Sequence, residues 1–210
     1  MPASFSASAD FNRAIFRKNK VELAIETGAL AYNTPLILDP IFGWKFKRDA
    51  SVPNYTLIPT SVLIRWQLYD PRGPWLLRGN TEFAFGAEYD AIPKGPESMY
   101  TGPLIGLRYN FIQANARIVP YFDMRSGLGY TDAAGPWEVK HNLPDIGQGS
   151  KFTFTFMLGS GLRYDFNERY SASMAVTFKH ISNLYLSEPK YFNHAVNVVG
   201  GTVGLNIALN

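Results

Sequence analysis

Residues 151–166, KFTFTFMLGSGLRYDF, alternate between two kinds of side chain, and this alternation is the strongest indication of the fold class. The even positions are mainly aromatic or aliphatic, whereas the odd positions are polar, charged or small. Successive side chains of a β-strand point to opposite faces, so a period of two predicts a strand with one apolar face and one polar face.

Seven further segments repeat this alternation, with apolar stripes along residues 21–29, 58–68, 75–85, 103–111, 118–124, 170–178 and 199–209. The opposite faces carry both signs of charge among Gly, Ala and Ser: Glu22, Glu26, Arg65, Arg78, Glu82, Glu88, Arg108, Asp123, Arg125, Arg163 and Lys179. Interleaved acids and bases suit the narrow lumen of a small barrel whose apolar face meets lipid. A soluble sandwich or lipocalin-like barrel is the alternative, with its apolar face inside.

The composition limits the class of protein. The chain has 210 residues, 15% aromatic and only 18% charged, with no cysteine and a net charge of +3. It holds no apolar run of the roughly 18 residues that a membrane-spanning helix needs. Disulfide scaffolds, thiolate zinc sites and cysteine nucleophiles are excluded. No basic stripe indicates nucleic-acid binding.

The connections between the stripes alternate in length. Residues 33–55, 131–150 and 183–195 form long connections and 90–98 an intermediate one, whereas the connections near residues 70–74, 113–115 and 167–168 are short. Long loops at one end and short turns at the other are typical of outer-membrane barrels. We therefore predict an all-β protein, an eight-stranded antiparallel up-and-down transmembrane β-barrel with both termini at the periplasmic end.

This barrel is expected to be one domain over residues 19–210, preceded by a pre-barrel segment over residues 1–18. Residues 1–11, MPASFSASADF, lack the basic and apolar regions of a signal peptide. Either the protein is cytoplasmic or the sequence is a mature chain with an added start methionine, and the barrel pattern favours the second.

A candidate site lies at the end of the seventh strand. His180 and Ser182 continue its apolar stripe, about 6.6 Å apart along the strand, and a serine beside an imidazole is the usual nucleophile and base of a hydrolase. Asn197 has the same facing on the neighbouring eighth strand and is predicted to orient the imidazole. His194 is an alternative orienting group, and the whole set has a plain alternative as a headgroup-level anchor at the barrel rim.

The residues of this site carry a resemblance to a known family. His180-Ile181-Ser182-Asn183, followed by Asn-His-Ala-Val-Asn at residues 193–197, resembles the motifs of outer-membrane lipid A 3-O-deacylases, the PagL-like acyloxyacyl hydrolases. Residues 95–97 (Gly-Pro-Glu), 106–111, 119–121 and 127–131 are also similar to members of that family, and the resemblance covers about residues 20–209.

The resemblance implies a role for each residue. Ser182 would be the nucleophile, His180 the general base and Asn193 part of the oxyanion hole. Asn197 falls at the position of the acidic triad member, and Asn183 would support local structure or the oxyanion. The implied substrate is lipid A of lipopolysaccharide, cleaved by a site that faces the outer leaflet of the bacterial outer membrane, in contact with outer-membrane lipids and without a cofactor or metal.

Three residues depart from the family pattern. Asn197 replaces a glutamate, Ala195 stands for a glycine, and the last residue is Asn210 where an aromatic residue is usual. Two alternatives therefore stay open. The site could be less active than that of other family members, or the protein could be a structural or adhesive barrel with an idle His-Ser pair. A small channel is disfavoured by the charged lumen, and the sequence leaves open whether the barrel forms a homodimer.

Overall fold

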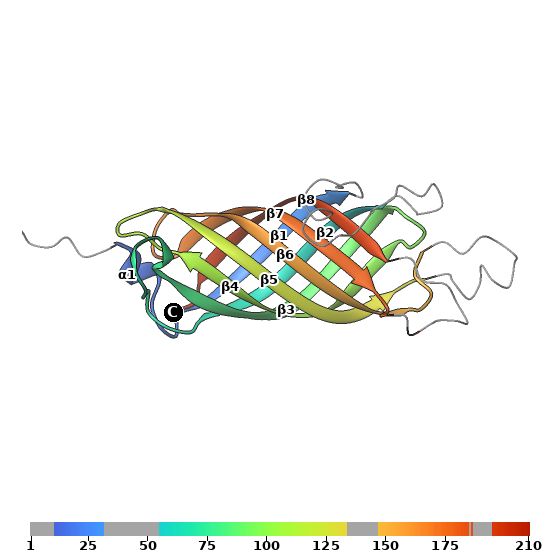
Figure 1. Ribbon diagram of the computed structural model, residues 1–210, viewed down its shortest axis with the longest axis horizontal. Coiled ribbons are helices and arrows are strands. Elements are labelled where there is room, and N and C mark those ends of the chain that lie inside the picture. Colours follow the sequence, from blue (N-terminus) through green and yellow to red (C-terminus); the bar gives the residue numbers. More distant parts are fainter. Residues whose placement is uncertain (1–10, 32–54, 134–146, 185, 187–194) are drawn as a thin grey trace, which may run out of the picture.

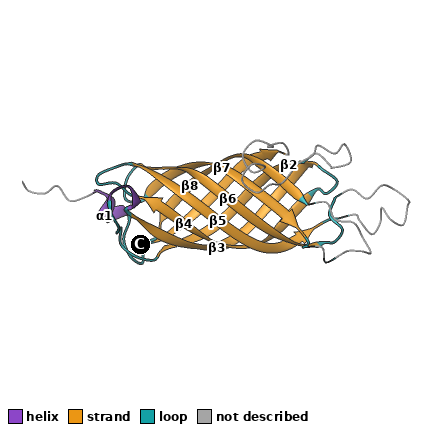
Figure 2. Ribbon diagram, viewed as in Figure 1, coloured by secondary structure: helices purple, strands orange, loops and turns teal. Residues whose placement is uncertain are grey.

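The chain closes into a barrel of eight antiparallel strands (Figures 1 and 2). The computed structural model describes residues 11–31, 55–133, 147–184, 186 and 195–210. The strands are β1 (Val21–Ala31), β2 (Thr56–Gln67), β3 (Gly79–Lys94), β4 (Met99–Phe111), β5 (Ile118–Thr131), β6 (Phe152–Asp165), β7 (Tyr170–Ser182) and β8 (Val196–Ala208). Each strand pairs with the next one in the chain, and β8 pairs with β1. The predicted up-and-down barrel is confirmed.

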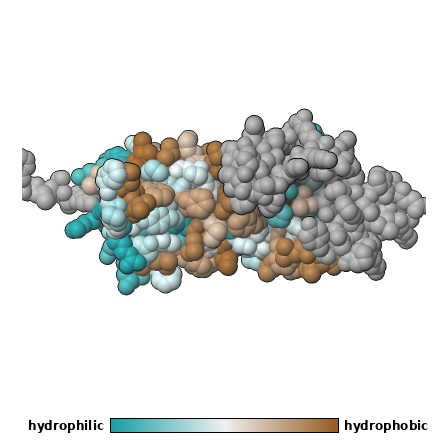
Figure 3. Space-filling view, in the orientation of Figure 1, coloured by the Kyte–Doolittle hydropathy of each residue, from teal (hydrophilic) through white to brown (hydrophobic). Residues whose placement is uncertain are grey.

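The outward face of the wall is apolar, as the alternation predicted. Ile105, Met174 and Val176 are 58%, 59% and 63% exposed, whereas residues of the opposite parity are buried. Figure 3 shows hydrophobic residues along the barrel wall and hydrophilic residues gathered at one end. An apolar wall with a polar interior is the arrangement that a lipid bilayer surrounds. Among the described residues no helix has the length and hydropathy to cross a membrane.

The two ends of the barrel differ. Helix α1 (Phe11–Ile15) and the C-terminus lie at one end, which we call the α1 end (Figure 1). The connections at this end are residues 68–78, 112–117 and 166–169. Strands β1, β3, β5 and β7 finish at the opposite end, which we call the site end because the predicted site residues lie there.

The structure corrects the start of the third strand. Residues 75–77 were predicted to begin it, but Trp75–Leu77 form a 3-10 helix, η1, and β3 begins at Gly79. Gly73 and Trp75 have φ values of 104° and 36°, which turn the chain before the strand can start. β3 also continues to Lys94, so the connection at residues 95–98 is shorter than predicted and the one at residues 68–78 is longer.

Ion pairs fill the middle of the lumen. Arg65, Arg108 and Arg125 converge on Glu26 and Asp123, with the Arg65 Nη2–Glu26 Oε1 distance 2.7 Å and the Arg108 Nη2–Asp123 Oδ2 distance 2.8 Å. All five side chains are at most 9% exposed. Buried charges need partners of opposite sign, so the pairing of acids and bases expected from the sequence is confirmed. The cavities found in this region measure about 20 and 10 Å³.

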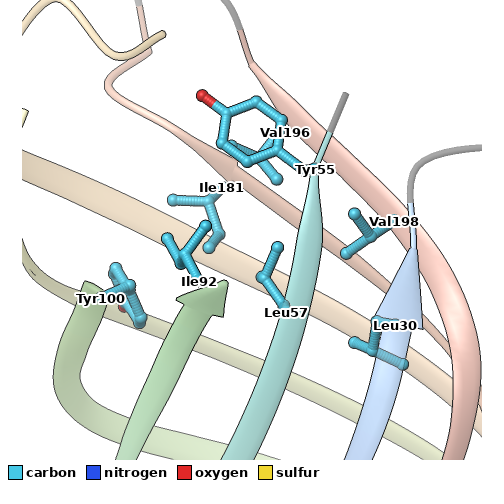
Figure 4. Close-up of a cluster of buried hydrophobic side chains, with 8 residues drawn as sticks. All are labelled: Leu30, Tyr55, Leu57, Ile92, Tyr100, Ile181, Val196 and Val198. Carbon is cyan, nitrogen blue, oxygen red and sulfur yellow. The ribbon is translucent and has the colours of Figure 1, made fainter. Parts of the chain in front are cut away.

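Further layers lie on either side of this centre. Toward the α1 end, Arg163 pairs with Glu22 and Asp165 at 2.6 and 2.7 Å, and the buried side chains of Ile15 and Phe16 pack beyond them. Toward the site end, Lys179 pairs with Glu88 and Asp90. An apolar cluster follows there, formed by Leu30, Tyr55, Leu57, Ile92, Tyr100, Ile181, Val196 and Val198 (Figure 4). Arg78 is the exception among the predicted lumen charges, because it lies in the connection between η1 and β3.

Candidate functional site

The final two strands bring His180 and Asn197 together. His180 of β7 stands directly opposite Asn197 of β8, and its Nδ1 lies 2.8 Å from the Asn197 Oδ1. On its other side His180 stands opposite Phe156 of β6. Directly opposed residues of antiparallel strands project from the same face, so the pair lies on the outward face of the wall, where both side chains are half-buried.

This hydrogen bond selects one form of the imidazole ring. An amide oxygen only accepts hydrogen bonds, so the ring nitrogen that faces Asn197 is the protonated one. In the neutral ring, Nε2 then carries the lone pair. A general base needs that lone pair, turned away from the group that orients the ring.

Ser182 is the last residue of β7, opposite Phe154 of β6. It shares the outward parity of His180, yet it is only 6% exposed. The Leu184 backbone N–H donates a hydrogen bond to the Ser182 Oγ at 3.2 Å. The hydroxyl oxygen is the acceptor in this contact, so the contact does not use the Ser182 O–H as a donor. Leu184 adopts a φ of 54°, uncommon for a leucine, so the chain turns sharply straight after the serine.

The other predicted residues have different outcomes. Asn183 follows β7 directly and is fully buried, and Ala195 is half-buried just before β8 begins. Asn193 and the alternative orienting residue His194 lie outside the described residues. The structure therefore places His180, Ser182 and Asn183 along one strand end and joins His180 to Asn197. In the part of the chain that is described, no group of three or more His, Asp or Glu side chains is arranged to hold a metal ion.

An apolar depression lies on the outward wall beside the site. It has a volume of about 270 Å³, and its lining includes Pro103, Ile105, Ser126, Leu128 and Phe154. Ser126 has a small side chain between the large neighbours Ile105 and Phe156, so the outward surface is recessed there. Phe154 also stands opposite Ser182, which places the depression one strand away from the serine.

Two buried residues behind the site were missed by sequence reasoning. The Gln148 Nε2 donates to the Ile181 carbonyl at 3.3 Å, and the Gln148 backbone N–H donates to the Glu97 carboxylate. Burial raises the pKa of Glu97 above its ordinary value, against the opposing effect of hydrogen bonds from the Gln148 N–H and the Tyr55 hydroxyl. Residues 95–97 contributed only to the family resemblance, and nothing in the local sequence marked Gln148.

Comparisons with known proteins show a matching family and similar solved barrels. A family described as "Lipid A 3-O-deacylase (PagL)" matches residues 60–206. The crystal structure of the outer-membrane enzyme PagL is similar, with a TM-score of 0.53 and 14% identity over 87% of this chain and 98% of that one. Neisserial surface protein A gives a TM-score of 0.49 and 13% identity over 90% and 96% of the two chains. No curated protein sequence matches.

These findings establish the class of the protein. The closed barrel has the fold of the PagL structure, and its apolar wall and the family match identify an outer-membrane β-barrel. The family match spans more than half of the sequence and begins within β2 and ends within β8. The chain therefore belongs to the PagL family of lipid A 3-O-deacylases.

Proposed function

We propose that this protein is a serine esterase that removes a 3-O-linked acyl chain from lipid A. The hydrogen bond between His180 and Asn197 is the observation that carries the proposal. A barrel whose charges only stabilised its lumen has no need of an oriented imidazole on its apolar wall. An ionisable group on a lipid-facing surface is costly and calls for a function.

The reaction would proceed in two steps. The Ser182 Oγ attacks the carbonyl carbon of the ester while His180 Nε2 takes the hydroxyl proton, and the sugar hydroxyl leaves with a proton returned by His180. Water activated by the same imidazole then attacks the acyl-serine, which releases the fatty acid and restores the hydroxyl. Asn193 and loop amides are proposed to stabilise the oxyanion, with Asn183 supporting them.

The wall beside the site supports an acylated substrate. The apolar depression one strand from Ser182 offers room for part of an acyl chain while the ester lies at the serine. The acyl chain of the substrate would thus stay on the lipid side of the barrel wall throughout the reaction. We place this site at the outer leaflet, where lipid A resides, and all the proposed residues come from a single barrel.

The test uses the purified, folded barrel with 3-O-acylated lipid A in detergent. Release of a 3-hydroxy fatty acid by the parent protein and no release by Ser182→Ala would support the proposal. Equal release by both would contradict the role of Ser182. A folded parent that releases nothing would instead favour a structural or adhesive barrel with an idle site.

A further inference from the structure

A buried carboxylate lies at the site end. Glu97, in the turn at residues 95–98 between β3 and β4, is 3% exposed. One of its oxygens accepts a hydrogen bond from the Tyr55 hydroxyl at 2.6 Å, and the other accepts one from the Gln148 backbone N–H. A buried polar group is retained at low cost only when it is hydrogen-bonded, and both carboxylate oxygens have a donor here.

Gln148 extends this contact to the strand that carries the candidate site. Its side-chain Nε2 donates to the backbone carbonyl of Ile181, and Gln148 and Ile181 are each 2% exposed. Ile181 lies between His180 and Ser182. A chain of buried hydrogen bonds therefore runs from Glu97 through Gln148 to the backbone between the candidate base and the candidate nucleophile.

The residues around Glu97 pack closely against this chain of hydrogen bonds. Gly147 has a φ of 89°, and a Cβ built on it would overlap Glu97 Oε1, so only glycine lets the segment approach the carboxylate. Tyr55 and Ile181 belong to the same buried apolar cluster (Figure 4). The two ends of the hydrogen-bonded chain are thus held in well-packed surroundings.

In the described part of the structure, hydrogen bonds and not ion pairs hold the Glu97 carboxylate. Among the described residues no lysine or arginine forms an ion pair with Glu97, and its burial raises its pKa. Burying an acid without a cation costs stability. What the carboxylate offers is two acceptor oxygens that hold two donors in a fixed geometry.

We propose that Glu97 is a positioning residue of the esterase site, which acts through Gln148 to fix the end of β7 and with it the Ser182 hydroxyl. The inference rests on the proposed function for its kinetic consequences. Glu97 does not touch the substrate in this account. It sets the geometry of the backbone from which Ser182 projects.

The kinetic test compares Glu97→Ala with the parent on 3-O-acylated lipid A. The substitution leaves the Gln148 N–H and the Tyr55 hydroxyl without their acceptor, so the end of β7 gains freedom. A misplaced nucleophile costs roughly 10- to 100-fold in rate. We expect kcat to fall by that factor with KM unchanged, because the acyl chain contacts the outward wall and not this buried cluster.

Three single variants and one double variant separate positioning from general loosening. Glu97→Gln keeps one acceptor oxygen and offers an amide that can donate to the Tyr55 oxygen, so it should restore kcat to within about threefold of the parent. Gln148→Ala should lower kcat as Glu97→Ala does, and the double variant should show no additional loss.

The third variant, Asp132→Ala, is the matched control for the same turn. Asp132 accepts hydrogen bonds from the Ser98 N–H, the Ser98 hydroxyl and the Met99 N–H. Its removal disturbs the turn that holds Glu97 without breaking the link through Gln148 to β7. We therefore expect kcat of Asp132→Ala to stay close to that of the parent.

A second measurement does not depend on catalysis. The Leu184 N–H donates to the Ser182 Oγ, so its hydrogen-exchange rate reports the order of the strand end. In micelles, Glu97→Ala and Gln148→Ala should accelerate exchange at Leu184, whereas Asp132→Ala should not. The heat-induced unfolding of each variant shows whether the barrel itself is intact.

The outcomes are distinct. An unchanged kcat and unchanged Leu184 exchange in Glu97→Ala would overturn the inference, as would an equal loss in Asp132→Ala. Glu97→Gln as impaired as Glu97→Ala would show that charge, and not hydrogen-bond geometry, is required. If the parent releases no fatty acid, the proposed function fails, but the exchange measurement still decides whether Glu97 positions Ser182.

Discussion

His180 and Asn197 stand opposite each other on β7 and β8, with Nδ1 of the imidazole 2.8 Å from the amide oxygen. The amide holds the ring and selects its tautomer, but it carries no charge. In the proposed mechanism, an imidazolium that forms during acyl transfer is therefore less stabilised than it would be beside a carboxylate. Asn197 would then supply the orientation that a triad needs and lack its electrostatic part.

Replacing Asn197 with Glu should supply that missing charge. A carboxylate beside the ring stabilises the imidazolium that forms in the proposed reaction. The rate should then rise by about tenfold, which corresponds to about 1.4 kcal/mol. Asn197→Leu, which removes the hydrogen bond, should instead lower the rate by roughly three- to tenfold. A kcat/KM unchanged in both variants would show that residue 197 does not act on the ring.

Filling the apolar depression should change the preference for acyl chains. Ser126 lies on the outward wall between Ile105 and Phe156, so Ser126→Phe would occupy part of the 270 Å³ space. We expect KM to rise more for long-chain than for short-chain esters. Ser160→Phe is the matched control, because Ser160 is also outward and exposed but does not line the depression. Equal effects of the two substitutions would exclude the depression as an acyl-chain site.

The buried ion pairs should stabilise the barrel without contributing to catalysis. Arg163→Met removes the guanidinium that pairs with Glu22 and Asp165. Leaving a buried carboxylate without its partner lowers the free energy of unfolding by roughly 3–5 kcal/mol. Urea unfolding in micelles measures this loss, and kcat of the folded variant should be unchanged. The exposed Lys151 provides a control, for which Lys151→Met should change stability by less than about 0.5 kcal/mol. If Arg163→Met lowered the free energy of unfolding no more than Lys151→Met does, the stabilising role of these pairs would be contradicted.

The raised pKa of Glu97 predicts a pH-dependent difference in stability. Its native pKa lies above the ordinary 4.5, so the folded barrel binds the proton more tightly than the unfolded chain. Its contribution to the free energy of unfolding is fully present below about pH 4.5 and is lost as pH rises through the native pKa. Glu97→Gln cannot ionise, so its stability relative to the parent should increase over that range.

Among the described residues, Tyr55 and Asp132 are the titratable groups whose effect on Glu97 is resolved, and both are retained in Glu97→Gln. Burial raises the pKa of Asp132, but the hydrogen bonds from Ser98 and Met99 together lower it below its ordinary value, and this effect cancels between the two proteins. Urea unfolding at a series of pH values measures the difference. A difference that does not change with pH would show that Glu97 titrates as it does in the unfolded chain.

The fold could be predicted because a barrel wall is a local pattern. Each strand separates an apolar outside from a polar inside, so residues 151–166 reveal their two faces without any knowledge of their neighbours. The same parity placed His180 and Asn197 on one face of adjacent strands. Their hydrogen bond followed from strand order and register, which an up-and-down topology fixes once the strands are found.

The features that were not predicted depend on backbone geometry or on distant contacts. Trp75 and Leu77 share the parity of the third apolar stripe, but the positive φ values of Gly73 and Trp75 place them in a 3-10 turn. The link from Glu97 through Gln148 to Ile181 joins three segments that are far apart in the sequence. A contact between segments that are distant in the sequence leaves no periodic pattern from which it could be predicted.

Mass spectrometry of lipid A tests the central claim most directly. Cells would express either the parent chain or Ser182→Ala, with both barrels verified as folded in the outer membrane. We expect lipid A to lose one 3-hydroxyacyl group only in cells with the parent chain. Lipid A that is unchanged by the folded parent, or deacylated equally by Ser182→Ala, would contradict the proposed serine esterase.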